Sequence, residues 1–326
     1  MPMQCNKERH EGADPRQRFI ISNEWIARSI LPMMLLVAVL ALAMASPVFL
    51  TAANLFNIAK QVASVGILSL GLLICIIGGN IDLSVGSTIG LTGALLGGLS
   101  IRYGVPWAFV AMVLVTVAVG LVNGALVASG KGLSVIVTVS TTSILRGLTY
   151  LYTDGKPIIL FPMPYAFLGS GELGPVPWPV IILLTASLIT HLVLNNTVWG
   201  RNLYSIGGNP EACRLSGIKV RTYVIGQFVA AAGFAALSSV VLLARVYSAQ
   251  PNAGLGMEMD AISAVLIGGA SLSGGTGSVG GTLLGLFMLG LINNGLNLLG
   301  VSSFYQYILK GSIILVAVLA DQVRRK

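Results

Sequence analysis

The stretch IIGGNIDLSVGS, residues 76–87, decides the fold of this chain, because polar residues interrupt a long apolar tract there. A carboxylate at membrane depth is costly and marks a functional site by default. Three interpretations of Asp82 stay open. It lines a substrate passage or its gate, it pairs with Arg146 to lock two helices together, or it caps a half-helix by accepting from exposed N–H groups. The third interpretation predicts a membrane-embedded helix break at this stretch.

The composition indicates a membrane protein. Hydrophobic residues make up 55% of the chain and charged residues 9%, against about 25% charged in soluble domains. The mean hydropathy is +0.87. The net charge of +8 does not indicate a nucleic-acid partner, because the basic residues lie in the tails and one loop, without interleaved aromatic residues that stack on bases. We therefore expect an all-α, polytopic membrane protein.

Ten apolar segments are candidates for spans, which need about 20 residues each. The third and eighth are short and glycine-rich, so we expect them to be broken or re-entrant. A basic tail (1–29) precedes the membrane domain (30–322), and residues 323–326 form a second tail. The candidates are residues 30–50, 62–78, 85–101, 106–128, 133–152, 177–195, 223–245, 259–273, 278–299 and 304–322.

The distribution of Lys and Arg predicts the orientation. With ten spans, most of them fall on the cytosolic side when both termini lie in the cytosol. On this topology the Pro- and Gly-rich loop 153–176 is external and forms an ordered surface. The loop 196–222 is internal, and it is the longest and most basic loop between spans.

A second stretch of the sequence weakly resembles the stretch that contains this break. Residues 73–99 and 264–287 both run from an apolar helix into IGG, then a short polar stretch, then glycine-spaced apolar residues. Transporters often place paired broken helices in corresponding positions of two halves, with the substrate path between them. Chance similarity between two glycine-rich spans is the alternative.

The chain offers no enzymatic site. GALVASGK (124–131) has five residues between its glycines and Gly132 after the lysine, so both the phosphate cradle and the magnesium-binding hydroxyl of a phosphate loop are wrong. The three cysteines lie far apart and form no metal pattern. We expect no catalysis, no cofactor and no metal.

Two other groups of residues are candidates. Asn293, Asn294 and Asn297 suit a hydroxylated substrate, because amides both donate and accept hydrogen bonds; hydrogen bonding between helices is the alternative. In IGGNPEACRLSGI (206–218) we expect a turn at Gly207–Asn209 and then a short helix that Gly217 ends. That helix either contacts a cytosolic partner or faces anionic lipid.

Four motifs carry a resemblance to a known family. GGNIDLSVGS (78–87), GGNPEACRLSGIKV (207–220), the segment 247–285 and NNGLNLLGVSSFYQYILKG (293–311) occur in the order in which they stand in the permease subunits of ATP-binding-cassette (ABC) importers for ribose, xylose, arabinose and galactose. The resemblance covers about residues 30–322. It departs from the family's pattern at Cys213, where a small apolar residue is expected.

The resemblance implies a fold similar to the roughly ten-helix importer class of the vitamin B12 permeases. It implies a bacterial inner-membrane subunit that works with a second permease subunit (identical or not), cytosolic ATP-binding subunits and a periplasmic sugar-binding protein. An ion-coupled secondary sugar transporter is the alternative. The residues expected at the pathway or gate are Asn80, Asp82, Ser84, Arg146, Asn293, Asn294 and Asn297. Those expected to couple to the ATPase are Gly208, Asn209, Pro210, Glu211, Ala212, Arg214, Ser216 and Gly217.

Overall fold

A computed structural model of the chain describes residues 33–315, with gaps at 34, 38, 131–132, 161–162, 303, 307, 310 and 313–314. Helices dominate this part of the chain. They are α2 (Ala52–Ile77), α3 (Val85–Tyr103), α4 (Val105–Ala128), α5 (Ser134–Thr153), α6 (Phe167–Ser170), α7 (Trp178–Asn196), α8 (Val198–Gly208), α9 (Pro210–Leu215), α10 (Val220–Val246), α11 (Met257–Ile267) and α12 (Val279–Leu298).

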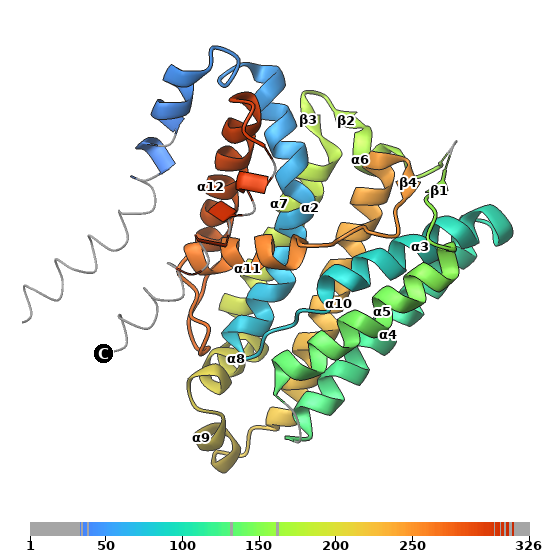
Figure 1. Cartoon of the computed structure of the whole chain (residues 1–326). Coiled ribbons are helices and arrows are strands. Elements are labelled where there is room, and N and C mark those ends of the chain that lie inside the picture. Colours follow the sequence, from blue (N-terminus) through green and yellow to red (C-terminus); the bar gives the residue numbers. More distant parts are fainter. Residues whose placement is uncertain are drawn as a thin grey trace, which may run out of the picture.

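Six of these helices are long and apolar enough to cross a membrane: α2, α4, α5, α7, α10 and α12. The third expected segment forms α3, with 19 residues. The eighth forms α11, with only 11 residues, and in Figure 1 it runs across the neighbouring long helices. The expected spans 30–50 and 304–322 lie partly outside the described residues. The all-α membrane architecture is confirmed.

The core is built around α2, whose most apolar stretch is 83% buried. It packs against α7, α10, α11 and α12, and α10 also contacts α3 and α4 (Figure 1). The corresponding stretch of α5 is only 17% buried. Its exposed side chains are largely Val, Ile, Leu and Tyr, which suit contact with lipid or with another apolar surface.

Glycines let the helices approach closely. A Cβ added to Gly120 of α4 would lie 2.6 Å from the Cα of Val229, and one added to Gly124 would lie 2.7 Å from the Cα of Ile225. The backbones of α4 and α10 therefore touch at two points four residues apart, which is the small-residue packing of membrane helices.

The two similar stretches of sequence, 73–99 and 264–287, each contain a helix break in the structure. Gly78 caps the end of α2 and Gly268 caps the end of α11, and the residues that follow, Gly79 and Gly269, have φ of 79° and 88°. Each glycine pair is followed by a backbone N–H that bonds back into the helix, from Asn80 to Cys75 and from Ala270 to Val265. Glycine adopts this left-handed conformation without a steric penalty. Both breaks therefore have the same backbone form.

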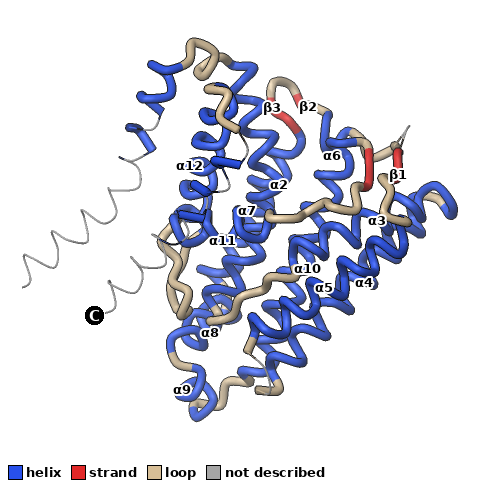
Figure 2. Tube along the Cα trace, viewed as in Figure 1, coloured by secondary structure: helices blue, strands red, loops and turns tan. Residues whose placement is uncertain are grey.

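Short strands lie at the end of the molecule opposite α9 (Figures 1 and 2). β1 (Ile158–Ile159) pairs with β4 (Ser248–Ala249), and β2 (Glu172–Leu173) pairs with β3 (Val176–Pro177), both antiparallel. An ion pair of 2.7 Å joins Lys60 to Glu172 at the same end. The predicted order in the loop 153–176 is confirmed for its described residues.

Candidate functional site

Asp82 lies in the first break and is 1% exposed. Its Oδ1 accepts hydrogen bonds from the backbone N–H of Ser84 (2.8 Å) and from the Ser84 hydroxyl (2.6 Å). No ion pair joins Asp82 to Arg146, both of which the structure describes. Of the interpretations left open by the sequence, the ion pair with Arg146 is not observed, and the Asp82 carboxylate instead binds the backbone N–H and hydroxyl of Ser84, the residue directly before α3.

The Ser84 hydroxyl also connects Asp82 to the neighbouring helices α4 and α5. It accepts a hydrogen bond from Nδ2 of Asn123 on α4 (2.9 Å), and Oδ1 of Asn123 accepts one from the Thr141 hydroxyl on α5 (2.7 Å). Asn123 is fully buried. We call Asp82, Ser84, Asn123 and Thr141 the buried polar chain. It connects the first break to α4 and α5 through side chains that are all buried except Thr141, which is partly buried.

A row of hydroxyls on α5 holds the backbone of the same break. The Ser134 hydroxyl accepts from the N–H of Ile81 (3.3 Å), and the Thr142 hydroxyl donates to the carbonyl of Leu83 (3.0 Å). Thr138 lies between them on the same helix face and donates to its own helix. The backbone N–H and C=O groups of this irregular segment thus find hydrogen-bond partners on α5. In a continuous helix the helix's own backbone would have supplied these partners.

Asn80 attaches the other end of the break to α10. Its Nδ2 donates to Oε1 of Gln227 at 3.0 Å. Gln227 is fully buried, and its amide nitrogen lies against Gly78, where an added Cβ would contact it directly. Three helices (α4, α5 and α10) therefore hold one short segment in place.

Arg146 lies farther along α5 and faces the protein. Its Nη1 donates to the carbonyls of Pro251 (2.8 Å) and Ala253 (3.0 Å). One turn away, the Tyr150 hydroxyl donates to Oδ1 of Asn252 at 2.7 Å. Arg146 and Tyr150 together fix the segment between β4 and α11, which is drawn as loop in Figure 2.

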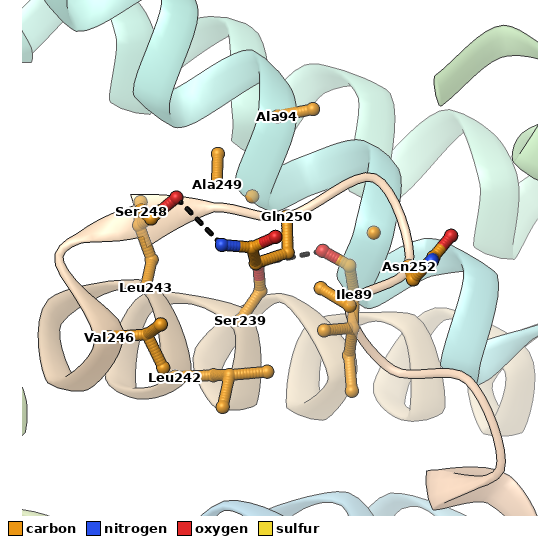
Figure 3. Close-up of a pocket in the computed structure, with 13 residues that line it drawn as sticks. Ile89, Ala94, Ser239, Leu242, Leu243, Val246, Ser248, Ala249, Gln250 and Asn252 are labelled. Carbon is orange, nitrogen blue, oxygen red and sulfur yellow. Dashed lines mark hydrogen bonds between the residues drawn. The ribbon is translucent and has the colours of Figure 1, made fainter. Parts of the chain in front are cut away.

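That segment covers a cavity of about 320 Å³ between α3 and α10 (Figure 3). The volume is at the small end of the range of small-molecule pockets, which is about 300–1,000 Å³. Leu242, Leu243 and Val246 give it an apolar wall, while Gln250 and Asn252 stand at its exposed side. Figure 3 shows Gln250 bonded to Ser248. The cavity suits a small molecule with both apolar and polar faces.

None of the seven residues that the sequence singled out for the pathway lines this cavity. Asn294 instead forms a reciprocal amide pair with Asn54 of α2, with distances of 3.0 and 2.9 Å. Asn297 accepts from Gln306 at 2.8 Å, and Asn293 is half-buried on α12. Hydrogen bonding between helices, the alternative interpretation, is what the geometry shows for Asn294.

The segment 196–222 is more helical than predicted. The expected turn at Gly207–Asn209 is wrong, because Gly207 and Gly208 complete the last turn of α8. Only Asn209 leaves the helical conformation, and its side chain caps α9 by accepting from the N–H of Ala212 (3.0 Å). The prediction that Pro210 stands in the first helical turn is confirmed.

α9 presents an exposed surface at the tip of the molecule (Figure 1). Arg214 donates two hydrogen bonds to Glu211 (3.0 and 2.6 Å), and these lower the pKa of the Glu211 carboxyl from its ordinary value. Leu215 is 79% exposed, whereas Cys213 is buried and anchors the helix. The residues predicted for coupling are all exposed: Gly208, Asn209, Pro210, Glu211, Ala212, Arg214, Ser216 and Gly217.

Sequence reasoning missed the partners of the break. Asn123 and Gln227 are single amides in apolar helices, and nothing in the sequence pairs them with residues 80–84. The hydroxyls of α5 do carry a signal, because Ser134, Thr138 and Thr142 recur every four residues and so share one helix face. Within the described part of the chain, no three His, Cys, Asp or Glu side chains come together as potential metal ligands.

Comparison with known proteins places the chain in a family. Residues 54–318 match the family described as branched-chain amino acid transport system / permease component. The chain is 42% identical to the ribose import permease protein RbsC of Bacillus subtilis over 291 residues, covering 88% of this chain and 90% of that one. It is 40% identical to RbsC of Escherichia coli K12 over 303 residues, covering 91% and 94%.

An L-arabinose transport system permease protein, AraH of Escherichia coli K12, is 34% identical over 323 residues, covering 96% of this chain and 95% of that one. No solved structure matches the chain. The family match includes both helix breaks and α9, and these relatives each cover about nine-tenths of the chain or more. The chain therefore belongs to this family of transport-system permease components.

Proposed function

We propose that this chain is the permease subunit of an ABC importer for a monosaccharide, with ribose as the first candidate substrate. The observation that carries the proposal is the 38–42% identity to ribose import permeases along about nine-tenths of the chain. The arabinose permeases follow at 33–34%. The family description names branched-chain amino acids, but the most similar relatives named here are pentose permeases.

The energy for transport comes from a separate subunit in this proposal. α9 and its flanking residues form the surface that contacts a cytosolic ATP-binding subunit. Three features support this role: the exposed apolar side chain of Leu215, the exposed Glu211–Arg214 pair, and the buried anchor Cys213. The exposed leucine offers a protein partner an apolar contact, and beside it stands an arginine, a residue type that is enriched at protein interfaces.

The importer that we propose contains two permease subunits, two ATP-binding subunits and a periplasmic sugar-binding protein, in the inner membrane of a bacterium, with both permease termini in the cytosol. The membrane domain extends over residues 30–322, and the coupling loop over residues 196–222. The permease does no chemistry, because the ATP-binding subunits hydrolyse ATP. Binding of ATP shifts the population of inward- and outward-facing states through its higher affinity for one of them.

Within this function we assign the first break and Arg146 to the gate. Asp82 and Ser84 are almost completely buried and already hydrogen-bonded, which favours a role in shaping the break over direct contact with sugar. Arg146 supports the wall of the cavity through two backbone carbonyls. Asn293 and Asn297 remain candidates for contact with substrate, because neither is fully buried.

Transport by the reconstituted importer tests the proposal. The permease, its ATP-binding subunit and its binding protein are placed in proteoliposomes, and uptake of labelled ribose, arabinose and leucine is measured with and without ATP. We expect ATP-dependent uptake of ribose that excess unlabelled leucine leaves unchanged. Uptake of leucine in place of sugar would reject the substrate class. Sugar uptake driven by a proton gradient without ATP would favour the ion-coupled alternative.

A further inference from the structure

The two helix breaks meet in the structure. The backbone N–H of Gly275, in the second break, donates to the carbonyl of Ile77 at the end of α2, at 2.8 Å. A Cβ added to Gly274 would lie 2.8 Å from the Cα of Gly79. The loop after α11 thus packs directly on the loop after α2, although almost 200 residues separate them in the sequence.

The last turn of α8 fills the remaining side of this junction. Gly207 is buried, and a Cβ added there would overlap both the carbonyl of Ile77 and the N–H of Gly275. One turn earlier, the Tyr204 hydroxyl donates to the carbonyl of Gly277 at 2.8 Å. We call Gly207, Ile77 and Gly275 the three-way contact. It joins α8 to both breaks at backbone distance.

Only Asn209 separates α8 from α9. Its side chain caps α9 while its backbone N–H bonds back to the Ser205 carbonyl of α8 (3.0 Å), so the two helices are tied together at their junction. A displacement of α9 is therefore passed to the end of α8. Because closely packed backbones have little room to deform, the movement is passed on at Gly207 and not absorbed there.

We propose that Gly207 is the positioning residue through which α9 moves both helix breaks at once. The inference rests on the proposed function of α9 as the contact for the ATP-binding subunit. It adds that one glycine connects that contact to both helix breaks. Tyr204 supports the three-way contact, because its hydrogen bond to Gly277 holds the second break to α8. A side chain at position 207 separates the three segments and disconnects the ATPase cycle from the breaks.

The test uses the complete importer in proteoliposomes, with three permease variants. Gly207→Ala forces the three-way contact apart. Tyr204→Phe removes only the hydroxyl that bonds to Gly277. Gly280→Ala is the matched control, because it stands exposed in the first turn of α12 and an added Cβ meets nothing within 4 Å. Three quantities are measured: co-purification of the ATP-binding subunit, basal ATP hydrolysis, and the stimulation of hydrolysis and uptake by sugar-loaded binding protein.

We expect Gly207→Ala to keep co-purification and basal hydrolysis while stimulation and uptake fall by at least about fivefold, the lower end of typical coupling between sites. Tyr204→Phe is expected to lower stimulation by about twofold to tenfold, the range of one hydrogen bond. Stimulation equal to that of Gly280→Ala in an assembled Gly207→Ala importer overturns the proposal.

If Gly207→Ala does not assemble, Tyr204→Phe decides: full stimulation in that variant also overturns the proposal. A failure of the underlying function looks different, because the wild-type importer itself then shows neither stimulation nor ATP-dependent uptake. If the Gly207→Ala importer assembles but loses basal hydrolysis and stimulation in the same proportion, the role of Gly207 is merely structural, and that outcome likewise overturns the proposal.

Discussion

The buried polar chain makes a specific energetic prediction at Ser84. Ser84→Ala keeps the Cβ and the backbone N–H, so it opens no large cavity and leaves one hydrogen bond to Asp82 in place. It removes the 2.6 Å bond from the hydroxyl to the carboxylate and the 2.9 Å bond from Asn123. The substitution is therefore a clean removal of two side-chain contacts.

The expected cost follows from these two contacts. A hydrogen bond to a charged group contributes about 1.5–3 kcal/mol. A hydrogen bond between membrane helices contributes about 0.6 kcal/mol on average and about 1.7 kcal/mol at most. We expect Ser84→Ala to lower the free energy of unfolding by about 2–5 kcal/mol. The Asn123 amide loses its acceptor in a fully buried position, so the upper half of this range is favoured.

A double-mutant cycle isolates the contact between the two helices. Ser84→Ala, Asn123→Ala and the double variant are unfolded in detergent mixed with sodium dodecyl sulfate, and helix content is followed by circular dichroism. The coupling energy should be about 0.6–1.7 kcal/mol. Ser140→Ala serves as the control, because its exposed hydroxyl bonds only to its own helix, and its cost should stay within about 0.5 kcal/mol. A coupling energy of zero, or a Ser84→Ala cost no larger than that of Ser140→Ala, refutes the buried polar chain.

Three further outcomes are expected. Gly120→Ala should lower the free energy of unfolding by about 1–3 kcal/mol through overpacking against α10. In Gly147→Ala the added Cβ meets nothing within 4 Å, so the free energy of unfolding should stay unchanged or rise slightly. Equal free energies of unfolding for the two variants would be inconsistent with glycine packing. Asn294→Leu should cost about 1–3 kcal/mol in the same unfolding assay, because it leaves the buried amide on α2 without its partner. Arg214→Ala should raise the pKa of Glu211 toward its ordinary value, since the hydrogen bonds from Arg214 are the main cause of the lowering. Carbon-13 NMR of the labelled carboxyl would show the titration move to higher pH, and an unmoved titration would exclude the pair in solution.

The class and layout of this protein could be predicted from the sequence. Apolar segments of fixed length with few charges require helices in lipid, because every backbone polar group there needs an internal partner. The glycine pairs after two of these segments predicted the breaks, and the structure has them at Gly78–Gly79 and Gly268–Gly269. Pro210 and Gly217 marked the position of a short helix, because local conformation is set by the residues themselves.

What the polar residues bind was decided only by the tertiary structure. Asp82 had several plausible partners in the sequence. Arg146, one of them, does not pair with Asp82 and instead donates to backbone carbonyls of a distant segment. Ser84 is hydrogen-bonded to Asn123, and Asn54 to Asn294. The residues of each pair lie too far apart in the sequence for a local pattern to predict the contact. The error at Gly207–Asn209 has the same origin. By local preference Gly207 suggests a turn, but in the fold it is a site of contact with two other backbones. Conformational preference acts within a few residues, whereas hydrogen bonds and close packing depend on which segments the fold brings side by side.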